Sequence, residues 1–199
     1  YAKGDMRQPV IYLTFDCGYE NGYTAQILDA LKKHNVHAVF FLTLSYAQKQ
    51  PALVRRMIDE GHTLGNHTKQ HKSMPTLSYE EFTKEIMEVH DYVKRTYGVE
   101  MNLFRFPAGT YSTRSLEAVR QLGYSSVFWS LAYRDWDPDH QQGTEVALRM
   151  MLDHAHPGAI YLLHPQSKDN ANALPAGIEG LKKMGYRFEA FRPEDYRAP

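Results

Sequence analysis

Apolar residues in this chain form short runs that alternate with longer segments in which they recur at every third or fourth position. The first run, at residues 10–15, is rich in β-branched and aromatic side chains and predicts a buried strand. Six similar runs predict strands at residues 37–43, 62–66, 102–106, 124–129, 159–163 and 186–191. Helical patterns separate these strands, so we expect βαβ units and a parallel sheet.

The helical segments have recognisable ends. The clearest is predicted at residues 79–97, where Ser78 and Glu81 form a capping-box pattern and Gly98 stands where many helices end. Further helices are predicted around residues 27–31, between Pro51 and Gly61, and at residues 114–122, 145–155 and 174–184. Seven strands in 199 residues fit either an open doubly wound sheet or a small incomplete barrel, and the pattern alone does not choose between them.

Composition and charge exclude several classes of protein. The 199 residues, 43% of them hydrophobic and 23% charged, fit one globular domain, which we expect to span residues 1–199 with short tails at 1–9 and 192–199. Lys and Arg number 23, as do Asp and Glu, and this balance argues against a nucleic-acid binder or a polybasic membrane binder. No stretch approaches the roughly 18 apolar residues of a membrane span. We expect a monomer.

Polar residues that interrupt the apolar runs share one location. They lie at or just beyond the ends of successive predicted strands: Asp16, Asn66, His67, Arg105, Ser130, Asp135 and His164. The carboxyl ends of parallel strands meet at one edge, where ligands bind in α/β folds, so we expect these side chains to converge. This convergence is the main evidence for function in the sequence.

Two histidines indicate a metal site. His67 and His71 stand four residues apart, a spacing that places both rings on one side of a helical turn, where they can hold Zn²⁺ or a similar ion. A polar turn without a metal is an equally good interpretation. The segment lacks the glutamate of the H-E-x-x-H pattern, so a general base must come from elsewhere, and Asp16 can supply it.

The one cysteine, Cys17, allows no intrachain disulfide. Beside Asp16 at a strand end, its thiol has three interpretations: a metal ligand, a catalytic nucleophile or a small buried side chain. Trp129, Trp136 and Tyr111 lie near the same predicted edge, where they can stack on sugar rings or pack in the core.

Taken together, these residues resemble the polysaccharide deacetylase family, the NodB-homology or family-4 carbohydrate esterases, from about residue 10 to 191. Five ordered motifs carry the resemblance: T-F-D-C-G at 14–18, H-T-K-Q-H at 67–71, R-F-P-A-G at 105–109, A-Y-R-D-W at 132–136 and L-L-H at 162–164. Two positions depart from the family pattern. Cys17 stands for the second Asp of the first motif, and Ala132 for the first Asp of the fourth.

Residues 16–23, 128–132 and 156–164 further resemble the PdaA-type subgroup, which removes acetyl from muramic acid for the δ-lactam of bacterial spore cortex. The family resemblance implies a distorted, incomplete (β/α)₇ barrel with about seven parallel strands. It implies N-deacetylation with a bound divalent metal, most often Zn²⁺, and the subgroup implies N-acetylmuramic acid in peptidoglycan glycan strands, outside the cytoplasm, as the substrate.

The resemblance also implies roles for single residues. His67 and His71 would hold the metal, with Cys17 as a candidate third ligand. The catalytic residues would be Asp16 as the base, His164 as the acid, Arg105 orienting Asp16, and Asp135 hydrogen-bonded to His164. Substrate contacts are expected from Asn21, Tyr111, Trp129 and Trp136.

Three other functions stay open from the sequence. Other branches of the family deacetylate chitooligosaccharides or xylan. Cys17 with His67 or His164 as its base would instead make a cysteine hydrolase. Loss of the metal along with the second Asp would leave a sugar-binding module without activity.

Overall fold

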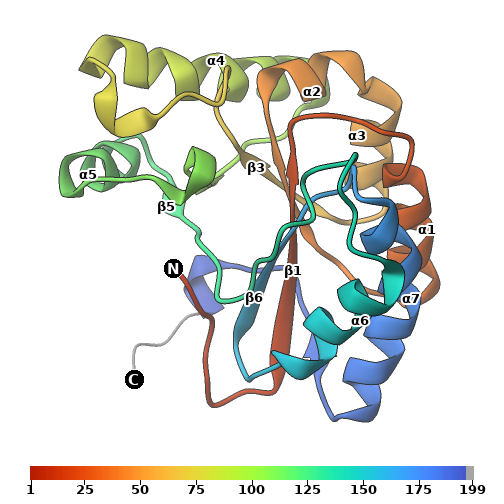
Figure 1. Cartoon of the computed structure of the whole chain (residues 1–199). Helices are drawn as coiled ribbons and strands as arrows, with labels where there is room; N and C mark the ends of the chain where they lie inside the picture. The colour runs from red at the N-terminus through yellow and green to blue at the C-terminus, as the bar shows by residue number, and fades with distance from the viewer. Residues whose placement is uncertain (196–199) are drawn as a thin grey trace.

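A computed structural model describes residues 1–195, which contain one sheet of seven parallel strands curled into a half-barrel (Figure 1). The strands are β1 (Val10–Cys17), β2 (Val39–Leu42), β3 (Thr63–Asn66), β4 (Leu103–Phe104), β5 (Ser125–Ser126), β6 (Ala159–Leu163) and β7 (Arg187–Phe188). Their order is β5-β4-β3-β2-β1-β6, with β7 paired to the start of β1. The first five strands thus lie side by side in sequence order, and the predicted incomplete barrel is confirmed.

Strand β1 is the longest of the described strands and lies between β2 and β6 (Figure 1). Its last four residues pair with β2, while residues 11–15 pair with β6 on the other side. All eight of its residues are buried, as expected of a parallel strand that is covered on both faces.

The side chains of β1 alternate between two environments. Leu13, Phe15 and Cys17 belong to the larger hydrophobic cluster, which includes the buried faces of the helices. Tyr12 belongs to a second cluster inside the curl of the sheet. Because successive strand residues point to opposite faces, Asp16 shares the inward direction of Tyr12 and Cys17 does not.

Seven α-helices cover the outside of the sheet (Figure 1). They are α1 (Thr24–Lys33), α2 (Leu44–Lys49), α3 (Pro51–Asp59), α4 (Tyr79–Tyr97), α5 (Thr113–Gln121), α6 (Thr144–Asp153) and α7 (Lys168–Lys183). Short 3₁₀ turns stand at Met74–Thr76, Pro107–Gly109 and Pro193–Asp195. None of the helices in the described part of the chain is long and apolar enough to cross a membrane.

Helix α4 has the predicted bounds, with the capping box at Ser78 and Glu81 and a left-handed Gly98 at its end. Two helices differ from the prediction. Helix α2 was not predicted, and α7 begins six residues earlier than predicted, at Lys168 rather than 174. Ser167 caps α7 by accepting a hydrogen bond from the Asn170 amide, and Pro175 lies inside the helix.

Strands β5 and β7 have two residues each and are shorter than the apolar runs that predicted them. After β5 the chain crosses to β6, where Leu131 forms a parallel bridge with Tyr161. Lys3 forms an antiparallel bridge with Ala159 at the other end of β6. Backbone contacts thus partly close the gap between the edge strands β5 and β6.

Candidate active site

A cavity of about 410 Å³ lies at the carboxyl ends of the strands. It is lined by Asp16, His71, Ala108, Trp129, Ala132, Tyr133, Trp136, Leu162 and His164. Five of these were predicted as site residues from the sequence: Asp16, His71, Trp129, Trp136 and His164. Of the strand-end residues expected to converge, Asp16 and His164 line the cavity, as the parallel topology requires. Asn66 and Ser130 do not: Asn66 donates to the Ile86 carbonyl, and Ser130 Oγ accepts from the Ile160 amide.

Asp16 is held by Arg105, which is fully buried inside the curl. The Arg105 Nη1 donates to Asp16 Oδ1 at 2.9 Å and to Thr14 Oγ1 at 2.7 Å. Its Nε and Nη2 donate to the carbonyl oxygens of Val127 and Phe128, each at 3.0 Å. These bonds fix the position of Asp16 and favour its ionised form. Removal of either partner of such a buried pair would leave the other charge uncompensated.

The pKa of Asp16 lies below its ordinary value despite burial, which alone would raise it. Burial has the largest single effect, but the positive charge of Arg105, the charge of His164 and the Arg105 hydrogen bond together outweigh it. Asp16 is therefore a carboxylate at neutral pH, with Oδ2 free of the arginine. A carboxylate in this state can accept a proton from a bound water.

His67 and His71 come together, but not on a helix as their spacing predicted. Residues 67–73 form no helix, and both Thr68 and His71 have positive φ, 69° and 56°. Asn66 Oδ1 accepts from the Thr68 amide at 3.0 Å, and Thr68 Oγ1 accepts from the His71 amide at 3.0 Å. These side-chain bonds build a tight loop in which the two imidazole centroids are 4.9 Å apart.

The ring of His67 is oriented for a cation. Its Nδ1 lies 2.9 Å from the Arg105 carbonyl, which can only accept, so Nδ1 carries the hydrogen. Burial lowers the pKa of His67 to about 4, so the ring is neutral and the Nε2 lone pair faces Asp16 Oδ2 at 3.4 Å. Two acceptors that face each other in this way favour a cation between or beside them, and a carbonyl on Nδ1 is common for metal-ligating histidines.

The neighbouring imidazoles of His67 and His71 fit a divalent ion, which they would hold through ring nitrogens. Within residues 1–195, no group of three or more His, Cys, Asp or Glu side chains has the arrangement of a complete metal site.

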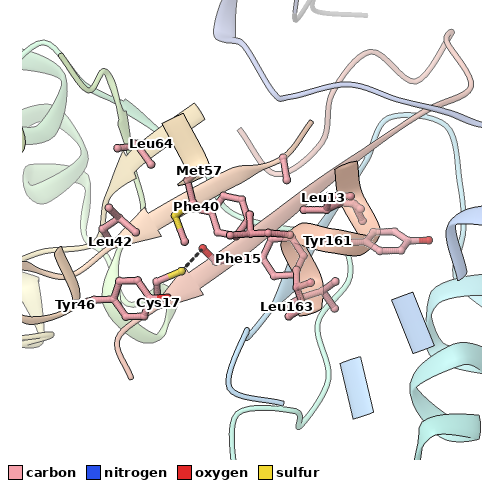
Figure 2. Packing of buried hydrophobic residues seen from close by; sticks show 14 of the residues in the cluster. Leu13, Phe15, Cys17, Phe40, Leu42, Tyr46, Met57, Leu64, Tyr161 and Leu163 are labelled. Atoms are coloured by element: carbon pink, nitrogen blue, oxygen red, sulfur yellow. Dashed lines mark hydrogen bonds between the residues drawn. The ribbon is translucent and has the colours of Figure 1, made fainter. Parts of the chain in front are cut away.

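Cys17 does not lie in the site. It is fully buried among Phe15, Leu42 and Tyr46, and its Sγ points to the Phe15 carbonyl at 3.9 Å (Figure 2). Burial raises the pKa of the thiol well above its ordinary value, and the charges of Asp16 and Glu20 raise it further. A protonated thiol in the helix-facing core is neither a metal ligand nor a nucleophile, so the third interpretation, a small buried side chain, describes its position.

His164, which lines the cavity, and Asp135 form a second pair. Asp135 Oδ1 accepts from His164 Nδ1 at 2.8 Å, and Oδ2 accepts from the His164 backbone amide at 2.8 Å. Burial alone would lower the pKa of His164, but the hydrogen bond and charge of Asp135, with the charge of Asp16, raise it above the ordinary value. An imidazole with a raised pKa thus shares the cavity with the Asp16 carboxylate.

The predicted sugar-binding residues have different positions. Trp129 and Trp136 line the cavity, and Trp136 is 52% exposed. Tyr111 lies outside the cavity lining, with its ring 4.8 Å from that of Phe128. Asn21 also lies outside the lining and donates from Nδ2 to the Gln166 carbonyl at 3.2 Å, which joins two loops at the rim.

Sequence reasoning missed two buried or cavity-lining polar residues. Tyr133 was quoted only as part of a motif, yet it lines the cavity. Asn170 contacts Asp135 and His164 directly, but it falls before the start predicted for its helix. The signal that could have found Asn170 is Ser167, whose hydroxyl caps the true helix start.

Comparison with known proteins gives one consistent relationship. A profile of the polysaccharide deacetylase family matches residues 3–127. The chain is 46% identical over 191 residues to the peptidoglycan-N-acetylmuramic acid deacetylase PdaA of Bacillus subtilis, a match covering 96% of this chain and 73% of that protein. It is 33% identical over 186 residues to a peptidoglycan-N-acetylglucosamine deacetylase of Bacillus cereus, covering 91% and 85%. The structure of Bacillus subtilis PdaA, a family 4 carbohydrate esterase, matches with a TM-score of 0.93 and 44% identity over 96% of this chain and 82% of that one.

Proposed function

This chain belongs to the polysaccharide deacetylase family, and on that premise we propose that it removes the acetyl group from N-acetylmuramic acid in peptidoglycan glycan strands. One structural observation supports the proposal above the others. A carboxylate held by an arginine and an imidazole held by a second carboxylate line the same cavity. Amide hydrolysis needs such a base and such an acid.

In the proposed reaction, Asp16 Oδ2 takes the proton of the water that attacks the acetyl carbonyl. Arg105 keeps the carboxylate ionised and fixes Oδ1, so that only Oδ2 is available. The 3.4 Å separation between Oδ2 and His67 Nε2 places the base next to the proposed metal ligand. The base therefore stands where an activated water would be generated.

His164 acts on the other side of the scissile bond. An amine leaves an amide only when its nitrogen is protonated, because the amide anion is too basic to depart. Asp135 holds Nδ1 and turns the remaining ring nitrogen toward the cavity, where it donates its proton to the leaving nitrogen. The same carboxylate stabilises the protonated ring before transfer.

Deacetylases of this family are in general metal-dependent. We propose Zn²⁺ held by the imidazoles of His67 and His71, because neutral nitrogen ligands suit this ion. When bound, such an ion polarises a carbonyl and lowers the pKa of a coordinated water from 15.7 toward about 7. Cys17 plays no part in this proposal, since its thiol lies in the helix-facing core.

The walls of the cavity fit an acetylated sugar. Trp129 and Trp136 offer aromatic faces on which a pyranose ring can stack. Leu162 and Ala132 form an apolar wall that suits the acetyl methyl group. Removal of the acetyl group leaves a free amine next to the lactyl carboxylate of muramic acid, and these two groups can close to the δ-lactam of spore cortex. Because peptidoglycan glycan strands lie outside the cytoplasm, we propose that the reaction takes place there.

Acetate release from peptide-free glycan strands tests the proposal. We expect release by the Zn²⁺-supplemented protein, loss on chelation and recovery when the metal is restored. Asp16→Asn should reduce the rate by a factor of about 10² to 10⁴, the usual contribution of a general base. Asp29→Asn, which changes a surface carboxylate paired with Arg56, is the matched control and should behave as the native protein.

Two outcomes would contradict this function. Undiminished acetate release by a folded Asp16→Asn variant would remove Asp16 from the reaction. Binding of the strands without acetate release, whichever divalent metal is supplied, would identify a sugar-binding module instead of an enzyme.

A further inference from the structure

A chain of hydrogen-bonded polar groups starts at one cavity-lining residue, Tyr133, and ends at another, His164. It passes through Asn170 on the first turn of α7 and through Asp135. We propose that Asn170, with Tyr133 as its second anchor, is a positioning residue that fixes the Asp135–His164 pair. The inference rests on the proposed role of His164 as the acid.

The contacts of Asn170 are specific and shielded from solvent. The residue is 1% exposed. Its Nδ2 donates to Asp135 Oδ2 at 2.5 Å and to the His164 carbonyl at 3.3 Å, while its Oδ1 accepts from the Tyr133 hydroxyl. One amide group therefore contacts Asp135, His164 and Tyr133.

The chemistry of these partners fixes which way the amide faces. A carboxylate accepts only, so the amide nitrogen must point to Asp135. The Tyr133 hydroxyl then donates to the amide oxygen on the other side. A flipped amide would place its oxygen against the Asp135 carboxylate and leave the part-buried Tyr133 hydroxyl without its acceptor, so both partners favour the observed orientation.

The helix holds Asn170 in this position. Ser167 Oγ caps α7 by accepting from the Asn170 amide at 3.1 Å, and it donates to Gln141 Oε1 at 2.6 Å. An aspartate at this position would face Asp135 with a like charge, and an apolar residue would leave Asp135 Oδ2 with only the His164 backbone donor. Asparagine supplies a donor toward Asp135 and an acceptor toward Tyr133 without adding charge.

The consequence falls on His164. With Asn170 in place, Asp135 Oδ2 accepts from two donors, the Asn170 amide and the His164 backbone, which fixes the carboxylate plane and keeps Oδ1 2.8 Å from the ring. Without it, Asp135 can turn away from the ring while still accepting from the backbone. The charged groups that act on His164 are Asp135, Asp16 and Arg105, and only the contact with Asp135 depends on Asn170.

The test is an NMR pH titration of the His164 ring without substrate, followed by the pH–rate profile. Asn170→Ala should lower the pKa of His164 and lower kcat about tenfold with little change in KM. Tyr133→Phe should shift the pKa of His164 in the same direction by less. Asn170→Ser, which keeps a small polar side chain, should fall between the native protein and Asn170→Ala, and it also serves if Asn170→Ala does not fold.

Tyr97→Phe is the matched control, because the Tyr97 hydroxyl is bonded to the Ala47 carbonyl at 2.6 Å, outside the cavity lining. It should leave the His164 titration unchanged. An unchanged or raised pKa of His164 in folded Asn170→Ala, or a shift of equal size in Tyr97→Phe, would overturn the inference. The titration needs no turnover, so the two proposals can fail separately. If the protein releases no acetate but Asn170→Ala still lowers the pKa of His164, the proposed function is refuted and the positioning role of Asn170 stands.

Discussion

Two neighbouring residues of β1, Asp16 and Cys17, have opposite environments because strand side chains alternate. Asp16 points into the curl, where it meets Arg105 and the cavity. Cys17 points out to the helix layer, where Figure 2 shows its sulfur among apolar side chains. The strand geometry thus separates the proposed base from a residue that the sequence alone left as a candidate ligand or nucleophile.

Replacing Cys17 with alanine should cost about 1 kcal/mol in the free energy of unfolding, from the loss of one buried atom in the core. The kcat/KM for acetate release and the affinity for Zn²⁺ should not change. Thermal unfolding, the acetate assay and calorimetric metal titration measure these quantities. A folded Cys17→Ala variant that had lost activity or metal affinity would restore the nucleophile or ligand interpretation.

The charge of Asp135 should set the alkaline limit of the reaction. His164 must be protonated to act as the acid, so the rate falls as pH rises through its pKa, which Asp135 raises. Asp135→Asn removes that charge and should move the alkaline limb of the kcat profile to lower pH. The acid limb, set by the lowered pKa of Asp16, should move much less. An alkaline limb that stayed in place would mean that another group titrates there.

The proposed chemistry depends on loops more than on regular elements. The segment after β3 has left-handed backbone at Thr68 and His71, and the turn after β4 has it at Ala108 and Gly109. Left-handed backbone in a non-glycine residue is unfavourable and persists where surrounding contacts impose it, which happens often at active sites. Here it brings His71 to the cavity and lets the turn after β4 pass close to Trp129.

Gly109 offers a test of that turn. Its φ is +64°, and an added Cβ would lie 2.6 Å from the Trp129 ring. Gly109→Ala should destabilise the fold by about 1–3 kcal/mol and raise KM, because a cavity wall must shift. Gly98→Ala is the matched control, with φ +73° and no atom within 4 Å of the added Cβ, so it should lose stability but keep KM. Equal KM values in the two variants would show that Trp129 does not contact the substrate.

Some elements could be predicted closely and others could not, for physical reasons. Helix α4 carries its own cap, an amphipathic face and a terminal glycine, so local signals suffice. Strands β5 and β7 have only two residues each, and their bounds depend on pairing partners far away in the sequence. The loop of His67 and His71 is built by side-chain bonds to backbone amides, and the four-residue spacing wrongly indicated a helical turn.

At the scale of the whole molecule, parallel pairing brings distant strand ends to one edge. The alternating pattern therefore predicted that Asp16 and His164 would converge, and both line one cavity. The pattern of apolar and polar positions could not show on which side of β1 the Cys17 thiol lies, nor that Asn170 reaches Asp135. Both of these contacts depend on how the helices pack against the sheet. These contacts appear only when α2 and α7 are placed against the sheet.

The zero net charge of the chain should make the reaction insensitive to salt. With no overall field to steer an anionic glycan, kcat/KM on peptide-free strands should change by less than about threefold from low to high ionic strength. Initial rates across a salt series measure this. A steep fall with added salt would instead indicate a local basic surface that captures the strand.

The central claim concerns which sugar loses its acetyl group, and one measurement tests it directly. Peptide-free glycan strands are treated with the Zn²⁺-supplemented protein and digested to disaccharides, and mass spectrometry locates the sugar that lost its acetyl group. We expect the loss on muramic acid, as the free amine or as the lactam formed from it, with the neighbouring glucosamine still acetylated. Loss of acetyl from glucosamine alone, or from neither sugar, would contradict the account.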